Sequence, residues 1–127
     1  MPISVSIRYI VDDVRAAVEF YTTYFGFTLE LDAAPAFASV ARDGVLLLLS
    51  GDGSSGKQRL PDGRAQVPGG WNRFQLHVSD LTAEVARLRA AGLTFRTPEI
   101  VTGPGGSQVL VEDPSGNPVE LFQSSRR

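Results

Sequence analysis

The chain has 127 residues, of which 43% are hydrophobic and 20% are charged, as in an ordinary globular domain that buries its own core. Its net charge is −2 and its Lys and Arg residues form no dense block, so it lacks the basic surface by which nucleic-acid-binding proteins hold phosphates. It has no cysteine and one histidine, His77, so it can form neither a disulfide nor a metal site that needs a thiolate or two imidazoles from one chain.

The N-terminal sequence lacks the basic start and the apolar stretch of a signal peptide, so we expect a cytoplasmic protein.

The first predicted element is a strand. Apolar residues alternate from Ile3 to Val11, which predicts a strand whose second face carries Ser4, Ser6 and Arg8.

The same transition from a strand into a helix occurs twice, in "SIRYIVDDV" at 6–14 and in "RFQLHVSDL" at 73–81. Asp13 and Asp80 are each placed to cap the N-terminus of a following helix. Gly26 and Gly92 lie where the end of a helix needs a left-handed residue. Helical spacing of apolar residues supports both helices, in the first through Val14, Ala17, Val18, Tyr21 and Phe25 and in the second through Leu81, Val85, Leu88 and Ala91.

Three strand-like runs complete each half. In the first half they are 27–31, 36–42 and 45–50, with a hairpin turn at Asp43-Gly44, and the longest apolar run, at 45–49, is far too short to cross a membrane. In the second half they are 94–101, 107–113 and 118–123, with a tight turn at 113–117. We interpret the Gly-, Pro- and Ser-rich segment 51–70 as a long surface connection, and "TGPGGSQ" at 102–108 as a loop, since it matches no phosphate-binding motif.

The duplication predicts an α+β fold of two βαβββ modules that form a cupped mixed sheet around a shared cavity. Each helix covers the apolar face of its own sheet and leaves the other face to the cavity. We expect one domain over residues 1–127, with the first module at about 1–52, the connection at about 53–69 and the second module at about 70–127.

Four stretches carry a resemblance to a known family: "VDDVRAAVEFYTTYFGF", "PGGWNRFQLHV", "VSDLTAEVARLRAAGLTFR" and "GPGGSQVLVEDPSGNPVELFQ". Together they resemble the vicinal oxygen chelate superfamily of glyoxalases, bleomycin-resistance proteins and extradiol dioxygenases. The resemblance implies the glyoxalase/bleomycin-resistance-like fold and a homodimer. It does not imply one activity, because members of the superfamily lyse, isomerise, oxidise or only bind their ligands.

Metal-dependent relatives take two ligands from each module, one on its first strand and one on its last. Carried over, these positions fall at Ser6 and Arg73 on the first strands, at Glu120 on the last strand, and at Leu46 or Leu48 in the first module. Of these side chains only the Glu120 carboxylate is a good ligand, since leucine cannot ligate and a guanidinium repels cations. We therefore expect no metal and no other cofactor.

Alternation along 71–78 and 118–123 places a set of polar and aromatic side chains opposite the helix. One interpretation is the wet face of an antiparallel sheet; the other, which the resemblance implies, is the lining of a pocket. We expect Arg73 and Glu120 to form an ion pair in which the guanidinium stands where a cation would, acting either as a ligand contact or as a plain salt bridge. The candidate ligand-binding residues are Arg73, Glu120, Gln75, His77, Trp71, Arg8, Ser6, Leu46, Leu48 and Phe122.

Two functions fit these residues. The first is metal-independent binding of a small aromatic or amphipathic molecule, of the antibiotic-sequestration type. The alternative is a lyase, isomerase or dioxygenase-type enzyme of the same superfamily, either metal-dependent through an atypical site or metal-free with Glu120 or His77 as the acid–base group. In both cases the expected partner is a small molecule, and neither a nucleic acid nor a membrane.

Overall fold

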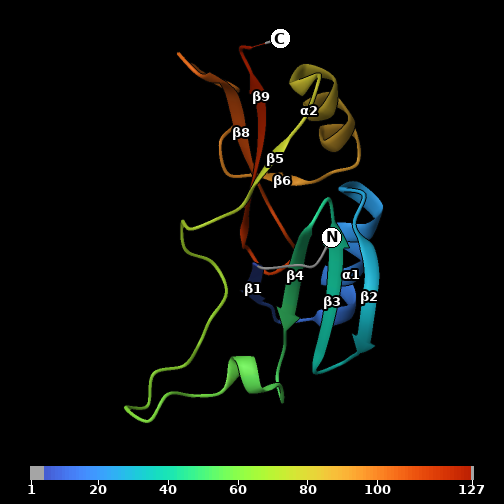
Figure 1. Cartoon of the computed structure of the whole chain (residues 1–127). Coiled ribbons are helices and arrows are strands. Elements are labelled where there is room, and N and C mark those ends of the chain that lie inside the picture. The colour runs from blue at the N-terminus through green and yellow to red at the C-terminus, as the bar shows by residue number, and fades with distance from the viewer. Residues whose placement is uncertain (1–4, 127) are drawn as a thin grey trace. The chain divides into compact units, whose positions relative to one another are not determined.

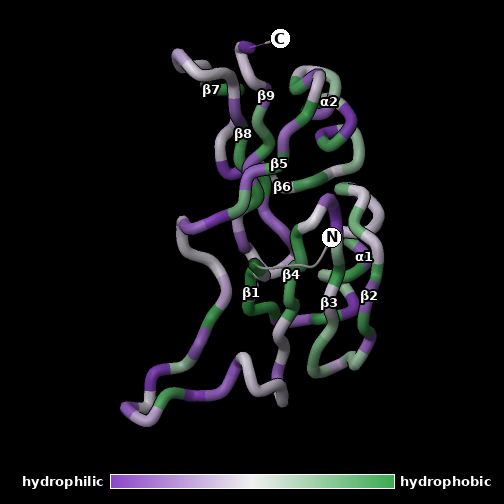
Figure 2. Tube along the Cα trace, in the orientation of Figure 1, coloured by the Kyte–Doolittle hydropathy of each residue, from purple (hydrophilic) through white to green (hydrophobic). Residues whose placement is uncertain are grey.

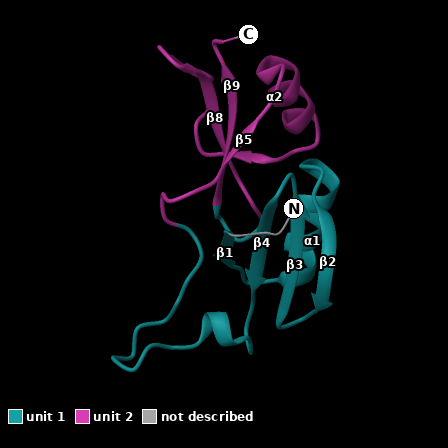
Figure 3. Cartoon of the chain, viewed as in Figure 1, with its two compact units in different colours: residues 1–69, 114–117 teal, residues 70–113, 118–127 magenta. Residues whose placement is uncertain are grey.

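The computed structural model describes residues 5–126, so the expected strand residues Ile3 and Ser4 lie outside the described part. It divides into two compact units, which Figure 3 shows in different colours. The first unit extends to Gly69 and includes Pro114–Asn117; the second runs from Gly70 to Asp113 and resumes at Pro118.

The first unit is a four-stranded sheet with one long helix (Figure 1). Its elements are β1 (Ser6–Ile10), α1 (Val14–Tyr24), β2 (Thr28–Ala33), β3 (Phe37–Arg42), β4 (Val45–Ser50) and the short 3₁₀ helix η1 (Ser55–Lys57). The strand order is β1-β4-β3-β2, with β1 parallel to β4 and the other pairs antiparallel.

The second unit repeats this plan. Its elements are β5 (Gln75–His77), α2 (Leu81–Ala90), β6 (Thr94–Phe95), β7 (Val101–Gly103), β8 (Gly106–Glu112) and β9 (Pro118–Ser124). The strand order is β5-β9-β8-β6, β7 also pairs with β8, and β5 is parallel to β9. In both units the first strand therefore pairs in parallel with the last, which confirms the predicted duplication and the α+β class.

The predicted caps and turns form as expected. Asp13 accepts a hydrogen bond from the Ala16 amide and Asp80 accepts one from the Ala83 amide, each at 3.1 Å. Gly26 and Gly92 adopt φ values of 70° and 82°, the left-handed conformation that ends a helix. These local signals are strong because each one satisfies backbone groups that the helix itself leaves unpaired.

Each helix buries its apolar stripe on its own sheet. The core of the first unit comprises Tyr9, Val11, Val14, Ala17, Phe20, Tyr21, Phe25, Phe27, Ala38, Val40, Leu47 and Leu49. The core of the second comprises Phe74, Leu76, Leu81, Val85, Leu88, Val109, Leu110, Val111, Val119 and Leu121. Val18 is only half-buried and Ala91 is exposed, so the two predicted stripes are narrower than expected.

Three strand predictions need correction. The strand predicted at 71–78 is shorter in the structure: β5 comprises only Gln75–His77, and Trp71 and Arg73 precede it. The run at 94–101 is broken into β6 and β7 around Pro98, because proline cannot donate to a ladder. The glycine-rich segment 102–108 is not a loop: it forms the β7–β8 hairpin, in which Gly103 pairs with Gly106.

The connection between the units leaves β4 at Ser50 and carries η1 near its start. Its few hydrophobic residues appear in Figure 2 as short green segments separated by hydrophilic residues. Lys57 at the end of η1 donates to the Val11 carbonyl at 3.0 Å and lies 2.9 Å from Asp52, which holds this part of the connection against the end of β1. Among residues 5–126, none of the helices is both long enough and apolar enough to span a membrane.

Candidate functional site

In the second unit, the sheet face opposite α2 carries most of the predicted site. Gln75 lies opposite Glu120 and His77 lies opposite Phe122 in the parallel β5–β9 pair, so all four side chains project from the same face. The flanking residues Val119 and Leu121 are fully buried on the helix side. The alternation predicted for 118–123 is thus confirmed.

Glu120 forms the predicted ion pair with Arg73. The Arg73 Nε donates to Glu120 Oε1 at 2.9 Å, and Nη2 lies 2.9 Å from the same oxygen. The second carboxylate oxygen, Oε2, accepts a hydrogen bond from the Gln75 amide at 2.5 Å. The carboxylate is buried, with 6% of the residue exposed, so these donors replace the water that it loses on folding.

Arg73 is held in turn by the backbone. Its Nη1 donates to the Trp71 carbonyl at 3.2 Å, which fixes the plane of the guanidinium relative to the start of β5. About a quarter of the side chain, 27%, stays exposed. The N–H groups that these contacts leave over are available to an anionic or carbonyl group of a ligand.

Trp71 is an exposed aromatic residue of the predicted site, with 67% of its surface accessible. The Arg96 guanidinium lies over its ring, 4.5 Å from the centroid. Arg96 also donates to Glu112 at 3.0 Å and to the Gly70 carbonyl at 2.6 Å. Trp71 is thus an exposed indole supported by an anchored cation, and no pattern in the sequence indicates that Arg96 would support it.

His77, the only histidine, makes a ring contact with Phe122. The centroids lie 5.3 Å apart and the planes are inclined by 70°. His77 is exposed and lies two residues beyond Gln75 on the same face of β5. The structure therefore brings Arg73, Gln75 and Glu120 into direct contact, whereas His77 forms a separate pair with Phe122.

In the first unit the corresponding face carries Ser6, Arg8, Leu46 and Leu48. Ser6 lies opposite Leu46 and Arg8 lies opposite Leu48 in the parallel β1–β4 pair. Arg8 Nη1 donates to the Ser50 hydroxyl at 2.7 Å. Gly56 of η1 lies so close that a β-carbon there would come within 2.1 Å of Arg8 Nη1. The expected residues thus share one face, and η1 covers one side of Arg8.

The residues at the family's metal-ligand positions do not fit a divalent metal. In the first unit these positions are occupied by a hydroxyl and an aliphatic side chain, Ser6 and Leu46 or Leu48. In the second they are occupied by Arg73 and Glu120, and both oxygens of Glu120 already accept hydrogen bonds from Arg73 and Gln75. A metal cation at Glu120 would lie beside a guanidinium that is itself positively charged, and electrostatic repulsion opposes this.

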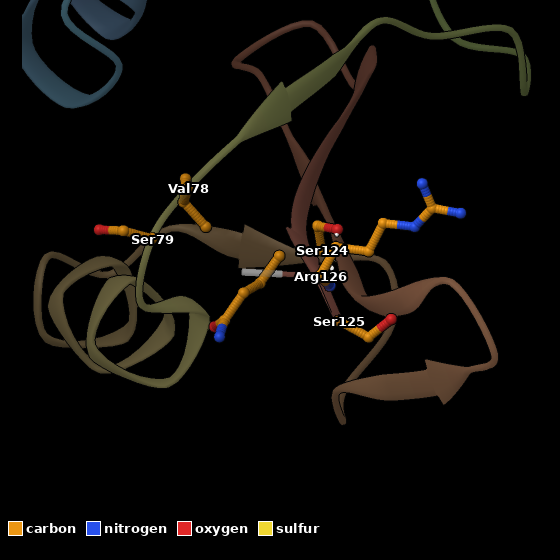
Figure 4. Close-up of a pocket in the computed structure, with 6 residues that line it drawn as sticks. Val78, Ser79, Ser124, Ser125 and Arg126 are labelled. Carbon is orange, nitrogen blue, oxygen red and sulfur yellow. Dashed lines mark hydrogen bonds between the residues drawn. The ribbon is translucent and has the colours of Figure 1, made fainter.

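One hollow in the second unit, of about 520 Å³, lies away from Arg73 and Glu120, where β5 runs into α2, next to the end of β9. Its lining residues are Val78, Ser79, Gln123, Ser124, Ser125 and Arg126. Figure 4 shows the side chains of Ser79 and Arg126 pointing away from each other, so these two polar groups do not converge on one ligand position.

Comparison with known proteins agrees with this architecture. The family model of the Glyoxalase/Bleomycin resistance protein/Dioxygenase superfamily matches residues 4–121. "Putative glyoxylase CFP32" of Mycobacterium tuberculosis is 28% identical over 115 residues, which is 90% of this chain but only 42% of that protein. The chain thus spans less than half the length of this curated relative.

Two solved structures share the fold over nearly their whole length. A superfamily member from Sphaerobacter thermophilus is 26% identical, with a TM-score of 0.75 and 98% of each chain covered. TnmS3, described as an antibiotic-binding protein from Streptomyces sp. CB03234, is 28% identical, with a TM-score of 0.66 over 98% of this chain and 99% of that one. The family match over residues 4–121 and these shared folds together show that the chain belongs to the Glyoxalase/Bleomycin resistance protein/Dioxygenase superfamily.

Proposed function

We propose that this protein binds a small aromatic or amphipathic molecule without a metal ion. The observation that carries the proposal is that Arg73 and Gln75 donate hydrogen bonds to both oxygens of Glu120. Glu120 is the one side chain at the family's ligand positions that could bind a metal, and it binds protein donors instead. A guanidinium in that position recognises carboxylates and carbonyl groups, whereas a metal centre would polarise them.

The surroundings of Arg73 suit a ligand with a flat ring. The exposed indole of Trp71 follows directly on Gly70 and is supported from one side by Arg96. Aromatic rings gain roughly 0.5–1.5 kcal/mol from stacking beyond the area that they bury. TnmS3, which shares the fold, is described as an antibiotic-binding protein, and this favours sequestration over turnover for the present chain.

The test combines metal analysis with ligand screening. We expect purified protein to contain far less than one divalent metal per chain, and its melting temperature to rise with members of a panel of aromatic antibiotics and aromatic carboxylates. Arg73→Met should reduce that rise for the carboxylates, because it removes the guanidinium. Arg59→Met is the matched control, since Arg59 is an exposed residue of the connection that donates only to the Gly63 carbonyl.

Two outcomes would contradict the proposal. One is a tightly held divalent metal at one ion per chain, together with turnover of a thiol–aldehyde adduct or a catechol. The other is a panel of compounds that leaves the melting temperature unchanged at concentrations up to the millimolar range.

We propose further that two copies associate. The outer edge of β2 is not paired within the described sheet, and every residue of this strand is exposed. Such an edge presents backbone donors and acceptors that a second chain can pair. Sedimentation equilibrium should give twice the mass of the chain, and a monomer at high micromolar concentration would exclude the dimer.

A further inference from the structure

A β-bulge in β2 moves one leucine to an unexpected face of the first unit. Strict alternation would place Leu29 and Leu31 on the same side of the strand. Leu29 pairs with Val40, but the register then shifts and Leu31 pairs with Ser39. Val40 belongs to the core beneath α1, whereas Ser39 lies opposite Leu48 on the other face. The bulge therefore separates the two leucines onto opposite faces of the sheet.

Leu31 is the outermost residue of a row that crosses the face away from α1. Following the pairing from strand to strand, the row runs from Arg8 through Leu48 and Ser39 to Leu31. The neighbouring rows add Ile10 and Phe37, with Ser50 between them, on one side, and Leu46 and Ala41, flanked by Ser6 and Thr28, on the other. Leu31 is 53% exposed, so this face carries apolar surface that the unit itself does not bury.

A cation lies at the β1 end of the same row. Within residues 5–126 no carboxylate forms an ion pair with Arg8, in contrast to Arg73 with Glu120. The Arg8 guanidinium is nevertheless held in place, because Nη1 donates to Ser50 and Gly56 packs against it. An unpaired, positioned guanidinium beside an apolar surface is complementary to a molecule with one anionic group and an apolar body.

We infer that this face binds amphipathic anions, with the anionic group at Arg8 and the apolar body over Leu48 and Leu31. The inference rests on the proposed binding function and narrows its ligand class to aromatic or aliphatic carboxylates, sulfonates and related anions. It assigns Leu31 as a contact residue and Gly56 as the positioning residue for Arg8.

The test uses two fluorescent probes that differ in charge: 1-anilinonaphthalene-8-sulfonate, and the neutral N-phenyl-1-naphthylamine. The wild-type chain should bind both probes. Arg8→Gln should weaken binding of the sulfonate roughly tenfold and change binding of the neutral probe by less than about twofold, because only the sulfonate gains a charge-assisted hydrogen bond. Leu31→Asn should weaken both probes by roughly three- to tenfold, because both lose apolar contact.

Leu29→Asn is the matched control. It replaces the same residue type two positions away, and Leu29 is similarly accessible at 42% but lies on the helix side. It should leave both affinities unchanged. Gly56→Ala should act like Arg8→Gln, because the atoms nearest the added methyl group belong to the flexible end of Arg8 and to Ser50. The unfolding midpoint of each variant shows whether it is folded. If Leu31→Asn is unfolded, Leu31→Ala replaces it in the binding measurements.

Any one of three results would overturn the inference. Leu29→Asn and Leu31→Asn could weaken binding equally, Arg8→Gln could affect the two probes equally, or the wild-type chain could bind neither probe. Its failure is distinguishable from failure of the proposed function. An Arg73-dependent rise in melting temperature without the probe pattern contradicts only the inference, whereas one tightly bound metal per chain contradicts the proposed function.

Discussion

At position 120 a carboxylate lies almost wholly inside the second unit, and its three donor contacts determine its chemistry. Arg73 supplies the positive charge and Gln75 supplies a neutral hydrogen bond to the other oxygen. Three of the roughly four lone-pair sites of the carboxylate are thus already used, which leaves little room for a proton from a substrate. The arrangement thus suits the proposed recognition role of the ion pair better than an acid–base role.

The Arg73–Glu120 pair should show energetic coupling. Arg73→Met leaves Glu120 buried with one donor and should lower the free energy of unfolding by roughly 1–3 kcal/mol, less than for a fully buried pair because Arg73 is partly exposed. Glu120→Leu should cost a similar amount, and the double variant should cost less than the sum. Urea unfolding of the four proteins measures the coupling. Additive effects would show that the contact contributes nothing to stability.

Among the elements, the helices follow local rules and the strands do not. Asp13 and Asp80 cap α1 and α2 in the same way, because each accepts from the amide three residues on. Strand β2 departs from its own period at Leu31, since a bulge is set by the pairing with β3 and not by the residues of β2 alone. Strand β5 is shortened to Gln75–His77, and Arg73 reaches Glu120 from outside the ladder.

Removal of either helix cap should cost a similar amount of stability. Asp13→Ala and Asp80→Ala each leave one amide at a helix N-terminus without its partner, and each should lower the free energy of unfolding by about 1 kcal/mol. Glu99→Ala, which removes the same charge from an exposed loop position, should change it by less than about 0.5 kcal/mol. Thermal and urea unfolding of the three variants decide the matter. A loss confined to one cap would mean that the N-termini of α1 and α2 are not equivalent.

For the whole molecule, the dominant feature is one βαβββ plan used twice and joined by a long connection. The connection is anchored at its start, where Lys57 is almost buried, with 11% of its side chain exposed, and contacts Val11 and Asp52. Residues 58–68 are mainly exposed, and the side-chain hydrogen bonds of Arg59, Arg64 and Gln66 stay within the connection. The anchored part places Gly56 against Arg8, so the connection also shapes the binding face proposed for the first unit.

Loss of the Lys57 anchor should loosen the connection. Lys57→Met removes the hydrogen bond to Val11 and the ion pair with Asp52, so proteinase K should cleave near η1 several times faster. Arg59→Met is the control, because Arg59 is exposed and contacts only the connection itself. Mass spectrometry of the early fragments locates the cut. Equal cleavage of the two variants would show that Lys57 does not anchor this segment.

The sequence alone determined the duplication, the two capped helices, most of each core stripe and the face on which Gln75, His77 and Glu120 lie, because periodicity, caps and turn residues act over a few neighbours in the chain. It also implied the Arg73–Glu120 pair, through the resemblance of its motifs to the superfamily. Only the tertiary structure decided the contacts of Gln75 with Glu120 and of Arg96 with Trp71, the transfer of Leu31 to the open face, and the packing of Gly56 on Arg8. These depend on which strand pairs with which and in what register, and such long-range pairing leaves no periodic trace in the sequence.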